Sequence, residues 1–279
     1  MFHIQGDNVI KKIPFEFLFQ VFALLSAFVL VHGTYVMLIR PEADRALAIE
    51  HAKMKANPEY TEKQNLYIIL RDYEQEACII LMLWAFAILA YKGISVRRQY
   101  SQLDIDILQL PKGLPVGPED TRELLDRLNE LPESTRNFIL PRAMRTAIER
   151  FAATLNIQDS ATALHNVCES EGERLESELS IIRYIAWAIP SVGFIGTVRG
   201  IGGALSQANL AVQGDITGVT QNLGVAFNST FVALVISIVL MFFIHQLQLI
   251  QERLILDTES YCDTNLISRM RVPVGLNLP

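Results

Sequence analysis

Four long apolar stretches stand out along an otherwise polar chain. They lie at 14–39, 77–91, about 181–205 and about 223–249. A helix that crosses the hydrocarbon core of a bilayer needs about 20 mostly apolar residues. The second stretch is shorter than that, but Tyr91 and Lys92 give it the aromatic and basic end that is typical of a membrane interface. The pattern predicts an all-α integral membrane protein with four transmembrane helices.

The composition agrees with a membrane protein and argues against several other classes of protein. Of the 279 residues, 51% are hydrophobic and only 19% are charged, and the net charge is -6. Without basic runs interleaved with aromatic residues, nucleic acid is not an expected partner. The three cysteines, Cys78, Cys168 and Cys262, lie far apart without a CxxC pair, which favours free thiols over a metal site or disulfides. The sequence contains no nucleophile with its base and no phosphate-binding loop, so we do not expect an enzyme.

Basic residues predict the orientation in the membrane. The loop at 206–222 contains no Lys or Arg, which places it outside, whereas the long polar segment at 93–180 carries many arginines and belongs in the cytoplasm. Four spans with both termini cytoplasmic satisfy this pattern. The segment at 40–76 has basic residues matched by acids, and it lies outside in this topology. A three-span topology, with 40–76 inside, remains the alternative.

These assignments divide the chain into four regions. We expect a transmembrane hairpin with a charged connecting loop, with spans at about 15–39 and 75–92, then a cytoplasmic helical region, a pair of pore-forming helices and a cytoplasmic tail, at 1–92, 93–180, 181–250 and 251–279. Within the cytoplasmic region, a Pro/Gly linker at 110–120 ends where Asp120 or Thr121 can begin a helix. Beyond it, apolar residues recur at helical spacing and predict packing faces.

The third apolar stretch contains the sequence "IPSVGFIGTVRGIGGAL" at 189–205. Gly196, Gly200 and Ala204 are spaced four residues apart, so they form a strip of small residues where another helix can approach closely. Pro190 removes one backbone hydrogen bond and can bend the helix. The sequence alone does not separate a hinge from a fixed kink.

Small and hydroxyl-bearing residues also mark the fourth stretch. Ala226, Thr230, Ala233 and Ser237 share one helical stripe, and Ser229 lies beside Thr230. Hydroxyls in membrane helices often bond the carbonyl one turn earlier and do nothing else. Together with Thr197, however, this set could line a narrow, partly wetted path for a small cation. Neither stretch contains an acid to bind the ion, so a partner protein must supply the carboxylate.

The two segments "PSVGFIGTVRGI" and "LGVAFNSTFVALVIS" resemble the motif-bearing spans of the MotA/TolQ/ExbB proton channel family. The resemblance covers about 185–250 and includes the order of the motifs and the short external loop. Thr197 matches the family's first pore threonine, and Thr230, with Ser229 beside it, matches the second. Pro190 matches the proline of MotA-like members.

The resemblance implies an assembly and a mechanism. It implies a homo-pentamer in the lipid of the bacterial inner membrane, with spans three and four enclosing two copies of a MotB/TolR/ExbD-like single-span protein. Each partner copy supplies an Asp that carries H⁺ or Na⁺, no cofactor or metal is needed, and the ion gradient drives rotation or force across the envelope. The family also implies that Thr197 and Thr230 bond the partner's carboxylate and its proton or passing water.

Two positions depart from the family pattern. Val225 stands where ExbB-type members place an acid, and Arg199 stands where an aromatic residue is common. Arg199 could snorkel outward, pair with an acid of the 40–76 segment or tune how cations enter.

Two further interpretations stay open on the sequence alone. His32 is either a proton relay or a residue bonded to a neighbouring backbone group. For the chain as a whole, the alternative function is a membrane scaffold or self-contained channel whose small residues serve helix packing only.

Overall fold

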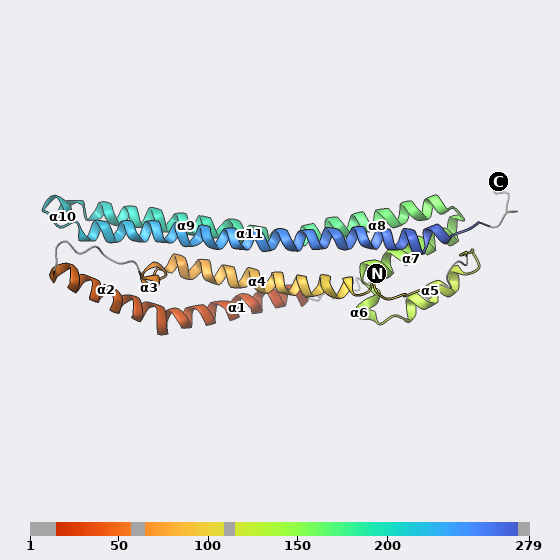
Figure 1. Ribbon diagram of the computed structural model, residues 1–279, viewed down its shortest axis with the longest axis horizontal. Helices are drawn as coiled ribbons and strands as arrows, with labels where there is room; N and C mark the ends of the chain where they lie inside the picture. Colours follow the sequence, from red (N-terminus) through yellow and green to blue (C-terminus); the bar gives the residue numbers. More distant parts are fainter. Residues whose placement is uncertain (1–14, 57–64, 109–114, 273–279) are drawn as a thin grey trace, which may run out of the picture. The chain divides into compact units, whose positions relative to one another are not determined.

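The computed structural model describes residues 15–56, 65–108 and 115–272, and these residues are almost entirely helical (Figure 1). Apart from an isolated parallel bridge between Val116 and Met270, the elements are α1 (Phe15–Thr34), a π-helical turn (Tyr35–Ile39), α2 (Arg40–Ala56), α3 (Leu66–Ile69), α4 (Tyr73–Tyr100), α5 (Thr121–Glu130), α6 (Glu133–Arg136), α7 (Ile139–Thr154), α8 (Ile157–Glu178), α9 (Ser180–Ser206), α10 (Ala208–Val212), α11 (Thr217–Asn265) and a 3-10 turn (Ile267–Arg269).

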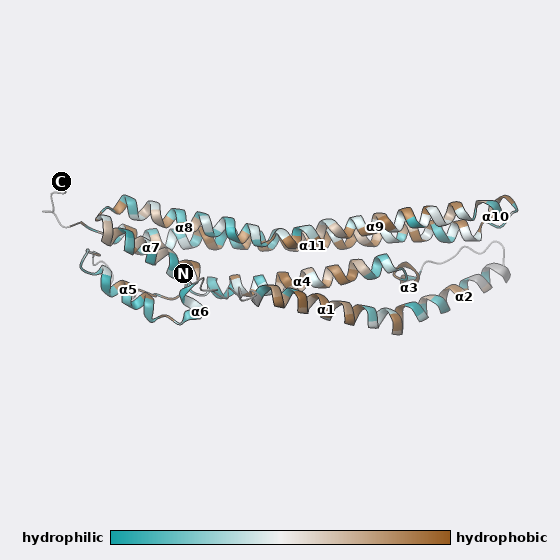
Figure 2. Ribbon diagram, turned by 180° about the vertical axis from the view of Figure 1, so that it is seen from behind, coloured by the Kyte–Doolittle hydropathy of each residue, from teal (hydrophilic) through white to brown (hydrophobic). Residues whose placement is uncertain are grey.

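Within the residues that the structure describes, four helical stretches are long and apolar enough to cross a membrane, which confirms the predicted all-α class and the four candidate spans. These stretches are Glu16–Glu50, Tyr73–Tyr100, Ile157–Ser206 and Thr217–Arg269. Figure 2 shows the apolar colouring concentrated on α1, on much of α4 and on the parts of α9 and α11 that correspond to the predicted spans. The orientation of these helices in the membrane, and with it the choice between four and three spans, stays a prediction.

The chain forms two compact units, and each of the three helices α4, α9 and α11 has residues in both units. Of the described residues, those up to 88 together with 184–241 form the first unit, and those from 89 to 183 together with those from 242 onward form the second. This division differs from the four consecutive regions expected from the sequence. The reason is that long helices carry the chain from one unit to the other without a linker.

The first unit has its apolar core along the lines where its helices pack, and the remaining apolar surface is left outside. Val31, Ala85, Ile88 and Ile236 are buried, and the indole nitrogen of Trp84 on α4 donates to the carbonyl of Gln20 on α1 at 2.9 Å. Large apolar side chains on α9 and α11 are exposed in the single chain, among them Phe194, Val198, Phe227, Phe231 and Ile238. Such exposed apolar faces are expected of helices that contact lipid or another subunit.

The second unit packs α5, α7 and α8 with the last part of α11 around a core of its own. The packing face predicted beyond the 110–120 linker is confirmed in α7, because Ala143, Ala147, Ile148 and Phe151 are buried there. α7 ends at Leu155 in the left-handed region (φ 53°), and the side chain of Asn156 then caps α8 by accepting from the backbone N–H of Gln158 at 2.9 Å. A tight turn and a cap therefore fold α8 back along α7.

The residues beyond 250, expected as a tail, are part of this second core. α11 continues to Asn265, and Cys262, Leu266 and Met270 are fully buried. The backbone N–H of Val116 donates to the carbonyl of Arg269 at 2.8 Å. α5 begins at Thr121, as the sequence predicted, whereas residues 109–114 of the expected linker lie outside the described residues. All three cysteines are free, as predicted, and the structure buries them. Burial raises the pKa of Cys168 to about 12.

Candidate ion-pathway site

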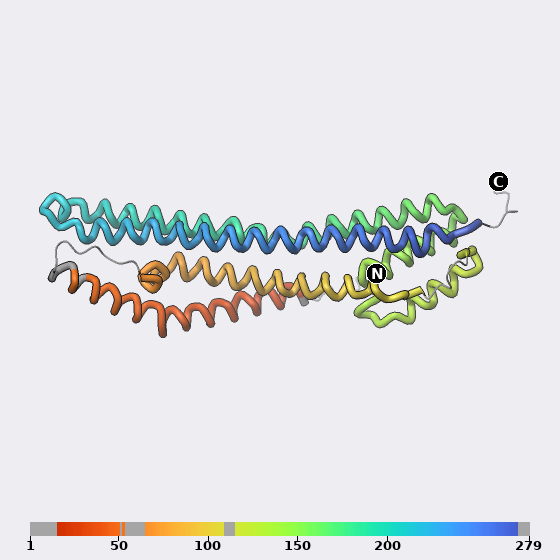
Figure 3. Tube along the Cα trace, in the orientation of Figure 1, coloured from red at the N-terminus to blue at the C-terminus, as the bar shows by residue number. Residues whose placement is uncertain are grey.

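Helices α9 and α11 lie side by side and antiparallel in the first unit, at a distance that only glycine allows (Figure 3). A Cβ at Gly196 would lie 2.4 Å from the Cβ of Ser229, and one at Gly200 would lie 2.6 Å from the carbonyl oxygen of Asn222. Ala204 is buried. The predicted small-residue strip is therefore the α9–α11 contact, and Gly193 extends it, since its Cβ would lie 2.4 Å from that of Ala233.

Thr197 and Thr230 meet across this contact, and we call them the threonine pair. Their hydroxyls are hydrogen-bonded to each other. The Thr197 Oγ1 also lies 3.1 Å from the carbonyl oxygen of Ala226, and the Thr230 Oγ1 lies 3.1 Å from that of Gly193. Each hydroxyl has one proton to donate and further lone pairs that can accept. The pair therefore keeps acceptor capacity after its bonds within the chain are made, and both side chains are half-buried.

The other hydroxyls of the predicted pathway are used within the protein. Ser229 is 1% exposed and donates to the carbonyl of Val225 one turn earlier at 2.7 Å. Ser237 donates across the contact to the carbonyl of Ala186 at 3.1 Å. In one chain, the stripe on α11 that includes Ala226 and Ala233 is thus mainly a packing face.

Pro190 lies inside α9, which stays helical from Ser180 to Ser206. Next to it, Ile189 is fully buried and its carbonyl accepts a weak hydrogen bond from the thiol of Cys78 on α4 at 3.6 Å. Proline has no N–H to donate to the carbonyl of Ala186, four residues earlier, and that carbonyl accepts instead from the Ser237 hydroxyl of α11 at 3.1 Å, as membrane proteins allow.

Arg199 has acidic partners that come from the 40–76 segment, one of the three outcomes that the sequence left open. Its Nη2 donates to the Oε2 of Glu74 at 2.7 Å and lies 3.4 Å from the Oδ1 of Asp72. The Glu74 side chain is only 10% exposed, and its Cγ lies 3.2 Å from the position of a Cβ on Gly196. The pair therefore holds the start of α4 against α9, two residues along the helix from Thr197.

A second ionic group joins α4 to the first span. The Oε1 of Glu76 lies 2.7 Å from the Nδ1 of His32, and the Oε2 accepts from Arg40. His32 therefore bonds a carboxylate, and the alternative of a neighbouring backbone partner is wrong. The guanidinium of Arg40 also lies over the ring of Tyr73, 4.3 Å from its centroid. Arg40 reaches these groups directly after the π-helical turn, a feature that often marks functional positions.

Sequence reasoning missed the acids of this arrangement. Glu74 and Glu76 lie two residues apart on the first turn of α4, so they point to different neighbours. The apolar run at 77–91 signalled a span, but no signal in the sequence tied its two preceding acids to Arg199 and Arg40. Within the parts of the chain that the structure describes, no group of three His, Cys, Asp or Glu side chains is placed to bind a metal.

Comparison with known proteins supports the motifs of α9 and α11. Residues 135–260 match the sequence model of the MotA/TolQ/ExbB proton channel family, and this range contains the threonine pair and the whole small-residue contact. Neither the curated proteins nor the solved structures include a match to the chain. The match supports an ion-channel subunit in general terms and confirms the resemblance found in the sequence. Residues 135–260, a little under half of the chain, are thus similar to the MotA/TolQ/ExbB proton channel family.

Proposed function

We propose that this chain is the ion-channel subunit of an energy-transducing complex in the bacterial inner membrane. Five copies surround two copies of a MotB/TolR/ExbD-like single-span protein, and the flow of H⁺ or Na⁺ through the complex drives rotation or force across the envelope. The chain itself carries out no covalent chemistry. Both termini lie in the cytoplasm, and α10 with the adjoining loop lies outside.

The threonine pair carries this proposal. Two hydroxyls from two apolar helices meet each other, lie within reach of two backbone carbonyls and retain lone pairs for a further donor. A protonated carboxyl group, a water molecule or a small cation is the kind of species that such oxygens can bind. Packing alone would be served as well by valine, which has nearly the shape of threonine.

The absence of an acid in the predicted third and fourth spans explains why a partner is needed. Glu74 and Asp72 of the first unit face Arg199, so an ion pair already occupies them. A carboxylate that is released and reprotonated in each cycle has to be free of such a cation. A partner helix beside the threonine pair would bring that carboxylate, and the exposed apolar faces of α9 and α11 offer it a surface.

Native mass spectrometry of the complex tests the proposal. The chain is tagged, expressed in its own host and extracted gently from the membrane. We expect five copies of the chain with two copies of a smaller single-span protein that has an Asp in its span. An assembly without such a partner would contradict the proposal and favour the scaffold or self-contained channel, in which the small residues serve packing only.

A further inference from the structure

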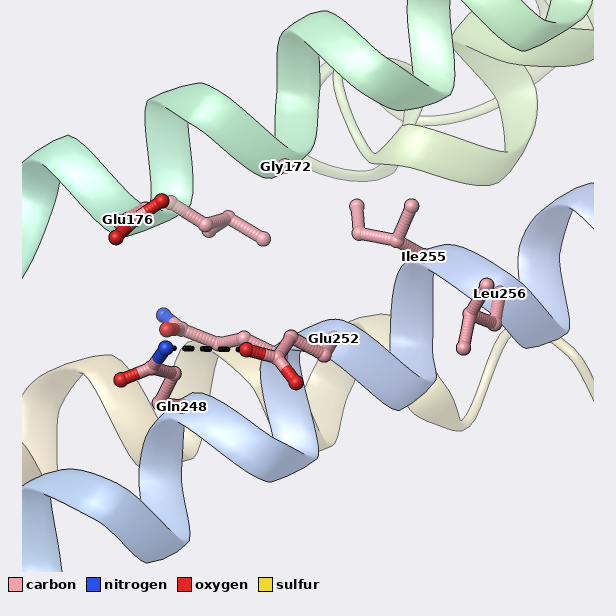
Figure 4. Close-up of a pocket in the computed structure, with 8 residues that line it drawn as sticks. Gly172, Glu176, Gln248, Glu252, Ile255 and Leu256 are labelled. Carbon is pink, nitrogen blue, oxygen red and sulfur yellow. Dashed lines mark hydrogen bonds between the residues drawn. The ribbon is translucent and has the colours of Figure 1, made fainter.

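A cavity of about 340 Å³ lies in the second unit between α8 and α11 (Figure 4). Its wall combines aliphatic and polar side chains, and it is lined by Gly172, Leu175, Glu176, Gln248, Gln251, Glu252, Ile255 and Leu256. None of these residues belongs to the candidate ion pathway. On α11, the lining begins at 248, where the predicted fourth span ends.

Gln251 is the residue that makes this cavity unusual. It is 3% exposed and lies on the buried stripe of α11, between Leu247 and Leu254, yet neither its Nε2 nor its Oε1 has a hydrogen-bond partner. A buried polar group without a hydrogen-bond partner destabilises the folded protein. A leucine would fit the stripe without this cost. The amide therefore indicates a molecule in the cavity that accepts from its N–H and donates to its oxygen.

Gly172, on the opposite helix α8, also indicates that the cavity accommodates a bound molecule. It lies within α8, where glycine is less favourable than alanine. A Cβ at this position would meet no atom within 4 Å, so close packing does not require glycine there. Its effect is to leave space beside Leu175 and Glu176.

The charges around the cavity define what it can bind. The Oε1 of Glu252 accepts from the Nε2 of Gln248 at 3.0 Å, as the dashed line in Figure 4 shows. Arg183 is not a lining residue, but it donates to two residues that are, to the Oε1 of Gln248 at 3.2 Å and to the Oε1 of Glu176 at 3.4 Å. Two carboxylates and one guanidinium thus stand around a partly aliphatic space. A zwitterion with an N–H cation and an anionic oxygen, joined by a short methylene stem, complements this wall.

We propose that the cavity between α8 and α11 binds a phosphoethanolamine group. Its ammonium donates to the Oε1 of Gln251 and to the Glu252 carboxylate, and its phosphate oxygen accepts from the Nε2 of Gln251 on the side of Arg183. The methylenes contact Leu175 and Ile255. The group can come from the head of a phospholipid at the cytoplasmic surface or from free phosphoethanolamine. The proposal does not depend on the proposed ion conduction.

The test uses the full chain in nanodiscs. In one arm the lipid is phosphatidylcholine and free phosphoethanolamine is titrated, with phosphocholine as the comparison. In the other arm phosphatidylethanolamine replaces part of the lipid, and native mass spectrometry counts the lipid molecules retained. Because trimethylammonium has no N–H to donate, we expect at least about tenfold preference for the ethanolamine compound in one arm or both. Binding in the free arm identifies a soluble ligand, and binding in the lipid arm alone identifies a phospholipid.

Two variants test whether the compound binds in this cavity. Gln251→Leu removes the amide and Gly172→Leu fills the cavity, and each should weaken binding at least about tenfold. Gln246→Leu on the exposed side of α11 is the matched control and should leave binding unchanged. Circular dichroism melting confirms that the variants are folded. Either of two results would overturn the proposal. In the first, the two lipids are retained equally and free phosphoethanolamine does not bind. In the second, a folded Gln251→Leu chain binds as well as the unmodified chain.

Discussion

The close approach of α9 and α11 predicts a large difference between two neighbouring glycines. Gly200→Ala would place a Cβ 2.6 Å from the carbonyl oxygen of Asn222, 2.7 Å from the backbone nitrogen of Ala226 and 2.8 Å from its Cβ. Two of these atoms are backbone, so no side-chain rotation can relieve the contact. Gly202→Ala, two residues further on the same helix, would meet no atom within 4 Å.

The size of the effect follows from these distances. Ordinary contacts of a Cβ begin at 3.4 Å, so α9 and α11 would have to separate locally by about 0.8 Å to admit the methyl group at Gly200. Overpacking of this kind costs roughly 1–3 kcal/mol. The separation would also lengthen the bond within the threonine pair, one turn away. Gly202→Ala has no such cost, and the higher helix propensity of alanine acts in its favour.

Equilibrium unfolding in mixed micelles with increasing dodecyl sulfate measures both variants. We expect Gly200→Ala to lower the free energy of unfolding by about 1–3 kcal/mol and Gly202→Ala to leave it unchanged or raise it slightly. Equal stability of the two variants would refute the packing of α9 against α11 through Gly200.

Three other predictions concern charge and space elsewhere in the chain. Arg199→Gln leaves the buried Glu74 unpaired and should destabilise the protein by about 1–3 kcal/mol, less than for fully buried pairs because Arg199 is 48% exposed. In unfolding experiments, the double variant with Glu74→Gln should recover part of the lost free energy of unfolding. An additive loss in the double variant would contradict the ion pair. The hydrogen bond that the His165 ring donates to the Glu259 carboxylate raises the pKa of His165 above its ordinary value of 6.5. The stabilising contribution of this bond is therefore present at pH below that value and is lost as pH rises through the raised pKa. NMR titration should give a lower pKa in Glu259→Gln, and an unchanged pKa would argue against this bond. Gly172→Ala should raise the free energy of unfolding by about 1 kcal/mol, since its methyl group enters open space; a destabilised variant in chemical unfolding would show that the cavity is not open there.

Periodicity in the sequence predicted the elements of the site well. Apolar runs located the four candidate spans, and a spacing of four residues placed Gly196 and Gly200 on one face of α9. The same rule placed Thr230 on the stripe of α11 that packs against α9. These predictions succeeded because helical geometry alone decides which residues of one helix share a face.

The pairing of helices distant in sequence could not be predicted in the same way. Glu74 reaches Arg199 across 125 positions, and Glu76 reaches His32 across 44. Nothing local in the sequence determines which helix will face another, so the acids were read only as part of a charged segment. The buried Gln251 was missed for a related reason, because its partnerless amide depends on how α8 and α11 enclose space.

The role of the threonine pair in ion conduction is tested most directly by ion flux through the intact complex. The complex is purified from its host with each variant and reconstituted into vesicles that enclose a pH-sensitive dye, with Na⁺ flux followed in parallel. Thr197→Val removes one hydroxyl at almost unchanged shape, and losing one hydrogen bond between membrane helices costs only about 0.6 kcal/mol on average, so the protein should stay folded. Thr220→Val, at the exposed start of α11, is the control. We predict that Thr197→Val abolishes flux and Thr220→Val preserves it; equal flux in both variants would contradict the assignment of the threonine pair to the ion pathway.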